Sequence, residues 1–379
     1  MKKILKTIKK VMITSVSLVV VLVVATIFLV NCSPQFGGKV TKEQKATYTL
    51  ASNYNEGKFL NKDPEAKVDM SFGNFFKMIK AYIKPNPHTI PEHNIAVEHV
   101  DSLTLTQTTE ANLVWFGHSS FLLQLEGNNI LLDPMFSEVP APYPFLGNKR
   151  FSKELPIEIK KLPKIDAIIL SHDHYDHLDF ESIKQLNEKV EHFFVPLGIS
   201  SHLKKWGVPA EKIHELNWWD EANFGNLTLA CTPAQHFSGR GLTDGGNTLW
   251  SSWVIKTKST NLFFSGDTGY NTHFTEIGNK YGPFDMALME CGQYNELWSK
   301  IHMMPEETAQ AAKDVKANKF IPIHWGAFKL ALHDWRDPIK RVSAKAKELN
   351  LNLISPKIGE MVSIHTVEPK EDMWWEKLK

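Results

Sequence analysis

The residues with the clearest capacity for chemistry lie together in one short segment, Ser171–Asp179, with the sequence SHDHYDHLD. The segment holds three histidines and three aspartates, and it directly follows the apolar run Ile165–Leu170. Neutral histidine and aspartate are ligands that Zn²⁺ and related first-row metals use in proteins. Packing explains one such histidine, but it does not explain the cluster. The segment therefore predicts a metal site.

The spacing within this segment suits two metal ions. The pattern H-x-H-x-D-H allows His172 and His174 to face one ion while Asp176 and His177 face another. Four side chains cannot complete two sites, so other parts of the chain must supply further ligands. Three candidates each follow a β-rich run: His236, Asp267 and His324. Loops that follow strands converge at one edge of a sheet, which would bring these side chains to the cluster.

The elements that would position these residues alternate between short apolar runs and helical patterns. The predicted strands are 113–116, 120–126, 130–133, 165–170, 193–196, 227–233, 249–255, 262–265, 286–290 and 320–323. The predicted helices between them are 180–190, 305–316 and 338–349. This order is typical of an α/β fold, and several of its strands end just before a histidine or an aspartate.

The motifs around the candidate ligands resemble those of a known family. The H-x-H-x-D-H motif, the later His236, the GDTG aspartate and the IHWG histidine are similar to the metallo-β-lactamase superfamily. More closely, SHDHYDHLD, TPAQHFSGR, FFSGDTGY, GPFD, PEE and IHWGAF, in this order, resemble N-acylphosphatidylethanolamine-hydrolysing phospholipase D and its bacterial relatives. The resemblance covers residues 113–359. It implies the αββα sandwich of the superfamily, in a catalytic domain that we place at 111–379.

The resemblance also implies roles for individual residues. One zinc ion would bind to His172, His174 and His236, and a second to Asp176, His177 and His324, with Asp267 bridging the two. Asp176 and Asp267 are thus expected to be catalytic as well as metal-binding, and Tyr175 and His302 to contact the substrate head group. The implied enzyme uses two Zn²⁺ to hydrolyse a phospholipid, N-acylphosphatidylethanolamine, to phosphatidic acid and N-acylethanolamine.

Other functions remain open from the sequence. The same metal pair can hydrolyse lactones, thioesters or other phosphoesters, so a lactonase or another hydrolase of a small soluble ester or phosphodiester is the alternative. A metal-binding surface protein is the non-enzymatic alternative. His118 and Asp133 would either orient metal ligands or only stabilise turns. Glu290 adds a carboxylate near the predicted site, where it could repel a phosphodiester or hydrogen-bond a ligand histidine.

The N-terminus predicts attachment to a membrane. Residues 1–10 contain five lysines, and residues 11–30 carry no charge. As a helix the uncharged stretch would be about 30 Å long, enough to cross the hydrocarbon core of a bilayer. We expect an anchor at 1–31 with its lysines in the cytoplasm; the alternative is a lipoprotein attached through Cys32. Both place the rest of the chain on the extracytoplasmic side of the membrane.

Residues 32–110 are predicted to form a polar N-terminal extension. Within them Met70–Ile83 has apolar residues at helical spacing beside lysines, which predicts an amphipathic helix. Such a helix either caps the core or faces lipid. Together with Trp218 and Trp219, it is the candidate surface for acyl chains.

The composition excludes several classes of protein. Lysine plus arginine number 43 against 42 aspartates plus glutamates, so the net charge of +1 argues against a nucleic-acid partner. The three cysteines, Cys32, Cys231 and Cys291, rule out a disulfide scaffold and a thiolate zinc site. The length of 379 residues allows one large domain with additions or two domains, and the sequence leaves open whether the chain forms a homodimer.

Overall fold

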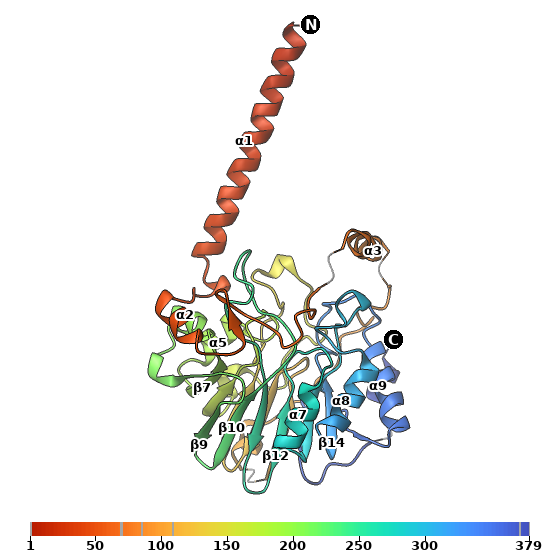
Figure 1. Ribbon diagram of the computed structural model, residues 1–379. Coiled ribbons are helices and arrows are strands. Elements are labelled where there is room, and N and C mark those ends of the chain that lie inside the picture. The colour runs from red at the N-terminus through yellow and green to blue at the C-terminus, as the bar shows by residue number, and fades with distance from the viewer. Residues whose placement is uncertain (1, 69–70, 85, 108–109, 371–372, 379) are drawn as a thin grey trace.

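The computed structural model describes residues 2–68, 71–84, 86–107, 110–370 and 373–378. Two seven-stranded β-sheets form its centre, and helices cover their outer sides (Figure 1). Side chains from both sheets, such as Leu123 and Phe264, share one core cluster. A second cluster lies between the first sheet and its helices. This is the αββα arrangement that the resemblance implies.

The first sheet carries the predicted metal-binding loop. Its strands lie in the order β16 (Met361–Ser363), β3 (Asn112–Trp115), β4 (Phe121–Leu125), β5 (Asn128–Leu132), β6 (Ile165–Ile169), β7 (Val190–Pro196) and β8 (Ile213–Leu216). Strands β4 and β5 form a hairpin whose turn residues Glu126 and Gly127 have φ of 49° and 76°, as a two-residue turn between twisted strands requires. Strands β5 to β8 are parallel, so their carboxyl ends meet at one edge.

The second sheet presents its parallel strands to the same edge. Its order is β15 (Asn352–Leu353), β14 (Lys319–Ile323), β13 (Met286–Glu290), β12 (Asn261–Phe264), β11 (Ser252–Lys256), β10 (Leu227–Thr232) and β9 (Glu221–Phe224). Strands β12, β13 and β14 are parallel. Their burial on both faces explains why they read as continuous apolar runs in the sequence.

The longer helices of the catalytic part flank the two sheets. They are α5 (Phe180–Leu186) and α6 (Ser200–Lys205) beside the first sheet, and α7 (His273–Lys280), α8 (Pro305–Asp314) and α9 (Asp337–Glu348) beside the second. α4 (Ser102–Gln107) precedes β3. The short 3₁₀ turns are η1 (Pro34–Phe36), η2 (Pro144–Leu146), η3 (Ile159–Lys161), η4 (Ala210–Lys212), η5 (Glu296–Trp298) and η6 (Trp374–Lys377). The prediction of a helix over 180–190 was wrong at its end, because Val190 already pairs with Ile165 as the start of β7.

The residues before 110 include segments that pack into the catalytic core. α2 (Lys42–Tyr48) and the hairpin of β1 (Tyr54–Asn55) and β2 (Lys58–Phe59) place Tyr48, Tyr54 and Phe59 in the core cluster between the sheets. The predicted boundary at residue 110 therefore marks a change of secondary structure and not a break in the core.

Two helices near the N-terminus stand away from the sheets. α1 (Lys2–Cys32) projects from one end of the molecule, and its residues Lys3–Cys32 include a stretch that is long and apolar enough to cross a membrane (Figure 1). α3 (Phe72–Ile83) lies at the same end, and Ile83 is 73% exposed, which favours the second of the two alternatives for this helix, a face turned away from the core. Met70 lies outside the described residues. Trp218 is buried, and it therefore belongs to the core and not to a surface for acyl chains.

Candidate dinuclear metal centre

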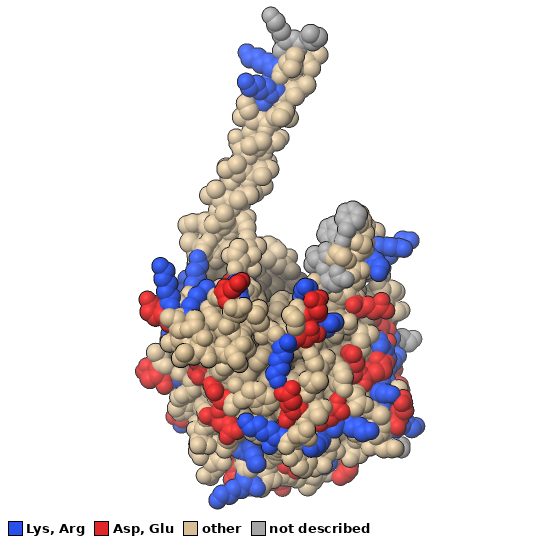
Figure 2. Space-filling model, in the orientation of Figure 1, with Lys and Arg blue, Asp and Glu red and all other residues tan. Residues whose placement is uncertain are grey.

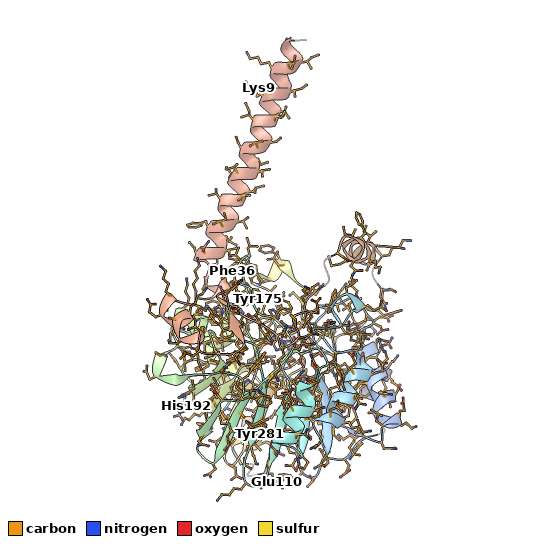
Figure 3. All side chains as sticks on the ribbon, viewed as in Figure 1. Lys9, Phe36, Glu110, Tyr175, His192 and Tyr281 are labelled. Carbon is orange, nitrogen blue, oxygen red and sulfur yellow. The ribbon has the colours of Figure 1, made fainter. Side chains whose placement is uncertain are left out.

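The seven predicted metal ligands converge at the edge where the parallel strands end. His172, His174, Asp176 and His177 occupy the loop after β6, and the other three follow β10, β12 and β14. Tyr175, in the middle of the loop, lies at the end of the molecule from which α1 projects (Figure 3). Residues more than 150 positions apart in the chain thus share one site, because the strands that carry them are neighbours in space.

The donor atoms fall into two groups. His172, His174 and His236 form the first, in which Nδ1 of His174 lies 2.9 Å from Nε2 of His172 and 3.2 Å from Nε2 of His236. Asp176, His177 and His324 belong to the second. Within each group the donor atoms lie within 4.8 Å of one another, which is the spacing that a single bound ion would bridge.

Asp267 lies between the two groups. Its Oδ2 is 3.9 Å from Nε2 of His172 and 3.1 Å from Nε2 of His177, and its Oδ1 is 3.0 Å from Nδ1 of His324. The side chain is buried, and it follows Gly266, whose φ of 55° lets the chain turn sharply after β12. A carboxylate in this position contacts both groups at once.

Burial and charge leave these side chains in the protonation states that metals bind. Burial lowers the pKa of His172, His236 and His324 well below that of an ordinary histidine, so they are neutral donors. Burial alone would raise the pKa of Asp267, but the adjacent His177 and His324 hold it well below its usual range. His177 differs, since the carboxylates of Asp267 and Asp176 outweigh burial and raise its pKa. A metal ion binding at Nε2 of His177 must therefore displace a proton.

The donor set fits a metal ion, since two of its buried atoms make no hydrogen bond among the described residues. These atoms are Nε2 of His177 and Oδ1 of Asp267, which lie 3.1 Å from Oδ2 of Asp267 and 3.0 Å from Nδ1 of His324 but without the geometry of a hydrogen bond. Buried polar atoms normally have partners, and a cation would supply one here. Histidine nitrogens and carboxylate oxygens are suited to zinc and other borderline first-row ions.

A second layer of residues holds the donors in orientation. Asp133 accepts a hydrogen bond from Nδ1 of His177 at 2.7 Å, which leaves Nε2 to face the site. Nε2 of His118 lies 2.8 Å from Asp176 Oδ2, and Nδ1 of His236 donates to the Ile301 carbonyl at 2.9 Å. The interpretation of His118 and Asp133 as orienting residues therefore agrees with their contacts.

A buried arginine that the sequence analysis missed fixes the loop after β6. The guanidinium of Arg240 donates to the carbonyls of Asp173 and Leu178, at opposite ends of the loop, and to the carbonyl of Gln35 near the N-terminus. It also lies 4.1 Å from the centre of the Tyr175 ring. The only sequence signal was its place in TPAQHFSGR, four residues after His236.

The two predicted substrate contacts occupy different surroundings. The hydroxyl of Tyr175 donates to the Arg240 carbonyl at 2.6 Å, so this side chain packs against Arg240 in the segment after β10. The ring of His302 lies 4.9 Å from that of His236 and 5.3 Å from that of His324, at the donor groups themselves.

Glu290 contacts His302 and not a predicted ligand. It is fully buried, with its carboxylate 3.1 Å from Nδ1 of His302 and accepting the Met303 N–H at 2.9 Å. Burial raises the pKa of Glu290 to about 7, although the contact with His302 opposes that shift. Because Glu290 holds Nδ1 of His302, the other ring nitrogen, Nε2, is left to face the donor groups.

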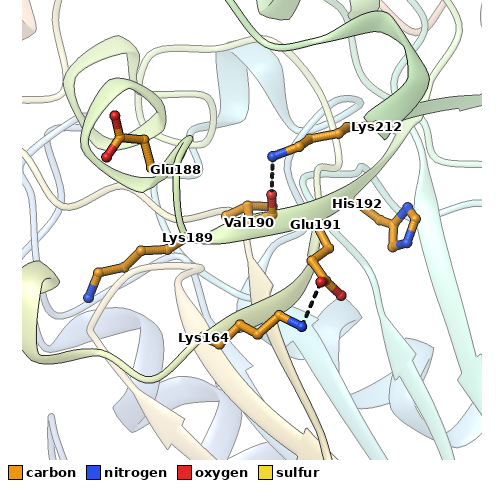
Figure 4. Close-up of a pocket in the computed structure, with 7 residues that line it drawn as sticks. All are labelled: Lys164, Glu188, Lys189, Val190, Glu191, His192 and Lys212. Atoms are coloured by element: carbon orange, nitrogen blue, oxygen red, sulfur yellow. Dashed lines mark hydrogen bonds and ion pairs between the residues drawn. The ribbon is translucent and has the colours of Figure 1, made fainter.

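Another hollow, at the edge of β6 to β8, lacks such convergence of donors. It is lined by Lys164, Lys189, Lys212 and neighbouring residues of β7 (Figure 4). Lys212 donates to the Val190 carbonyl at 2.7 Å, Lys164 pairs with Glu191 at 2.6 Å, and Lys189 donates to three carbonyls. These cations already have partners within the protein, so the hollow carries no evident chemistry.

Comparisons with known proteins agree with the geometry. Residues 128–325 match the model of the beta-lactamase superfamily domain. An uncharacterized protein of Mycobacterium tuberculosis is 36% identical over 335 residues, covering 87% of this chain and 89% of that protein. N-acyl-phosphatidylethanolamine-hydrolyzing phospholipase D 1 of Caenorhabditis elegans is 33% identical over 291 residues, covering 72% and 80%. Among solved structures, a metallo hydrolase of Ignicoccus hospitalis is similar with a TM-score of 0.50 and 22% identity, covering 67% of this chain and 98% of that one, which bears on the fold alone.

Proposed function

Because this chain belongs to the metallo-β-lactamase superfamily and is a metal-dependent hydrolase of that superfamily, we propose that it is a phospholipase D-type phosphodiesterase acting on N-acylphosphatidylethanolamine. The observation that carries the metal centre is Asp267, which contacts both donor groups. The substrate is inferred from the similarity to the nematode enzyme, which extends over most of both chains. The products would be phosphatidic acid and N-acylethanolamine.

The proposed cofactor is a pair of zinc ions. His172, His174 and His236 would hold one ion, and Asp176, His177 and His324 the other, with Asp267 shared. When bound, the pair would polarise a phosphodiester oxygen and make hydroxide available near neutral pH. Water adds to phosphorus in the overall reaction, the bond from phosphorus to the ethanolamine oxygen breaks, and that oxygen leaves with a proton.

The chain's own residues orient and hold the reacting groups. Asp133 and His118 fix His177 and Asp176, so the centre is preorganised before substrate arrives. His302, backed by Glu290, is proposed to donate a hydrogen bond from Nε2 to the phosphate or to the leaving oxygen. When Glu290 is protonated it carries no negative charge, so it does not repel a negatively charged phosphodiester that binds nearby. Tyr175 is proposed to shape the head-group side of the site through its packing on Arg240.

Attachment of the enzyme to a membrane completes the proposal. α1 would span the bilayer with its lysines in the cytoplasm and the catalytic part on the extracytoplasmic side; in the alternative, a lipid on Cys32 holds the protein there. A reporter fused after Lys379 distinguishes the sides, and a cytoplasmic reporter would contradict the orientation. Loss of fatty-acid labelling in Cys32→Ser would favour the lipoprotein.

The second candidate is a lactonase or another hydrolase of a small soluble ester. It is favoured by the chemistry of the centre, because a metal pair can polarise an oxygen of many kinds of ester and does not by itself select one carbon skeleton of the substrate. Purified protein assayed against phospholipids, lactones and thioesters separates the two. Highest kcat/KM on N-acylphosphatidylethanolamine supports the proposal, and equal or higher kcat/KM on a soluble lactone overturns it.

The assignment of the metal centre has its own test. Metal analysis should approach two equivalents of zinc per chain. Asp267→Asn should lower turnover by more than about 100-fold, since even orienting residues around metals are worth about 10–100-fold. The control His99→Ala removes an exposed histidine and should change neither value. Full activity in Asp267→Asn would refute the shared carboxylate.

A further inference from the structure

Apolar side chains are exposed at the end of the molecule from which α1 projects. The η2 tip, which we define as Tyr143–Leu146, exposes 82% of Phe145 and 58% of Leu146. In α3, Ile79 and Ile83 are also exposed. The surface between α1 and α3 is largely free of charged side chains, whereas the opposite end carries many of both signs (Figure 2). Exposed apolar groups that gather on one face indicate a contact with another apolar phase.

The η2 tip is tied to the end of α1. The Tyr143 hydroxyl donates to Oγ of Ser33 at 2.6 Å, and Ser33 directly follows Cys32, the last residue of α1. Phe36 packs edge-on against Tyr143, and Tyr143 stacks on Phe145 with ring centres 5.6 Å apart. If α1 spans a bilayer, Ser33 lies at the lipid–water boundary, and these contacts hold Phe145 at the same level.

α3 adds positive charge at the same end of the molecule. The segment Ser71–Lys84 carries Lys77, Lys80 and Lys84 and no acidic residue. Exposed Ile79 and Ile83 lie beside these lysines, as in helices that lie in a membrane interface. Such a helix complements a bilayer that contains anionic lipid.

The η2 tip is also connected to the metal-binding loop. Phe36 packs edge-on against both Tyr143 and Tyr175, with ring centres 6.4 Å apart in each pair. The contacts therefore run from exposed Phe145 through Tyr143 and Phe36 to Tyr175, between Asp176 and His174 in the loop. A membrane that contacts the η2 tip would therefore lie close to the metal-binding loop.

We propose that the η2 tip and α3 form a docking face that enters the head-group layer of an anionic bilayer, as a second membrane contact besides α1. The inference rests on the proposed membrane insertion of α1. It assigns to the chain a fixed orientation in which the metal centre opens toward the lipid surface. An enzyme held in this way takes its substrate from the bilayer without first moving it into water.

Fluorescent labels on the full-length chain test the docking face. With Cys32→Ser removing the exposed thiol and Cys231 and Cys291 buried, single labels are placed by V24C, F145C, I79C and, as the control at the far end, K258C. The label is an environment-sensitive nitrobenzoxadiazole. The protein is reconstituted into phosphatidylcholine vesicles with and without phosphatidylglycerol, and quenching by brominated lipid reports the depth of each label.

The four label positions distinguish the docking face from the anchor. The proposal expects lipid quenching at V24C, F145C and I79C but not at K258C, and a severalfold larger response of I79C when phosphatidylglycerol is present. Quenching at V24C alone overturns the docking face and leaves the anchor intact. No quenching at V24C overturns the anchor itself. If the label at F145C or I79C reports an apolar environment in the absence of lipid, and this signal increases with protein concentration, the face binds a second copy of the chain and the proposal is overturned.

Discussion

The protonation of two of the donor imidazoles is set by the partner on the other ring nitrogen. His236 donates from Nδ1 to the Ile301 carbonyl, and His177 donates from Nδ1 to Asp133. In both cases Nε2 is left to face the site. Asp133 also accepts the Ser171 N–H, so one carboxylate fixes the first residue of the loop and one of its donors.

Weakening the Asp133 carboxylate should lower metal affinity without removing a ligand. Asp133→Asn keeps the shape of the side chain but lacks the charge that holds the Nδ1 proton of His177. We expect zinc affinity to fall by about 10–100-fold, measured by competition with a chromophoric chelator. Asp101→Asn, on an exposed residue, is the matched control. Unchanged affinity in Asp133→Asn would show that His177 needs no such partner.

Glu290 should make stability depend on pH. Its pKa is about 7 in the folded protein against an ordinary value of 4.5, so between these values the folded state binds more protons than the unfolded state. Stability from this group is therefore lost as the pH rises through that window. The side chain in Glu290→Gln does not titrate. The free energy of unfolding of this variant should therefore rise relative to that of the wild type, by up to about 3 kcal/mol between pH 5 and pH 8.

Urea unfolding of both proteins across this pH range measures the effect of Glu290. Because Gln can still accept the Met303 N–H, the comparison isolates the charge. A constant difference between the two proteins from pH 5 to pH 8 would contradict the raised pKa of Glu290.

At the level of elements, the metal-binding loop is held by a residue distant from it in sequence. Arg240 is buried and binds the carbonyls of Asp173 and Leu178 together with that of Gln35. Asp173 adds contacts, since it accepts hydrogen bonds from the Gly239 N–H and the Thr248 hydroxyl. The loop is thus fastened both to the segment after β10 and to the N-terminal segment.

Replacing this arginine should loosen the loop. Arg240→Lys keeps the charge but cannot reach three carbonyls at once, so at least one buried carbonyl loses its partner. We expect a loss of roughly 1–3 kcal/mol in the free energy of unfolding, together with weaker zinc binding. Arg336→Lys, which alters an arginine paired with Asp334 near the surface, should cost less than half as much. Urea unfolding compares them, and equal losses would contradict the special role of Arg240.

The sequence predicted the elements whose apolar runs are long and whose ends carry motifs. The strands before the metal-binding loop and before Asp267 and His324 were predicted within a few residues, and the predicted superfamily is confirmed. β8 and β9 were missed because they are short and only half-buried, so their sequences lack an apolar run. Arg240 and the packing of Trp218 were missed because both depend on contacts between distant segments, which no local pattern encodes.

On the scale of the whole molecule, α1 is joined to the catalytic part without contributing to its core. The side chains of α1 are almost all exposed, and among the described residues its contacts with the rest include a hydrogen bond from Lys39 to Asn31 and one from the Ser33 N–H to the Leu29 carbonyl. The core begins beyond it, with Tyr48, Tyr54 and Phe59. The segment at Ser33–Phe36, in contrast, contacts Arg240, Trp206 and Tyr143. The segment that serves only for anchoring should therefore end at Cys32, and the part that the fold requires should begin at Ser33.

Removal of residues 1–31 tests this separation and the substrate together. The truncated chain should unfold within about 1 kcal/mol of the full-length protein, because no core side chain is lost. It should stay active on micellar N-acylphosphatidylethanolamine, since micelles supply the acyl chains that the anchor otherwise brings near, but it should lose most activity on vesicles. A chain that begins at Val40 is the matched comparison, and it should lose zinc as well, because Gln35 no longer meets Arg240. If the 1–31 deletion hydrolyses short soluble phosphodiesters or lactones as efficiently as the phospholipid, the enzyme is a broader hydrolase of this superfamily, and the tether serves its location and not its choice of substrate.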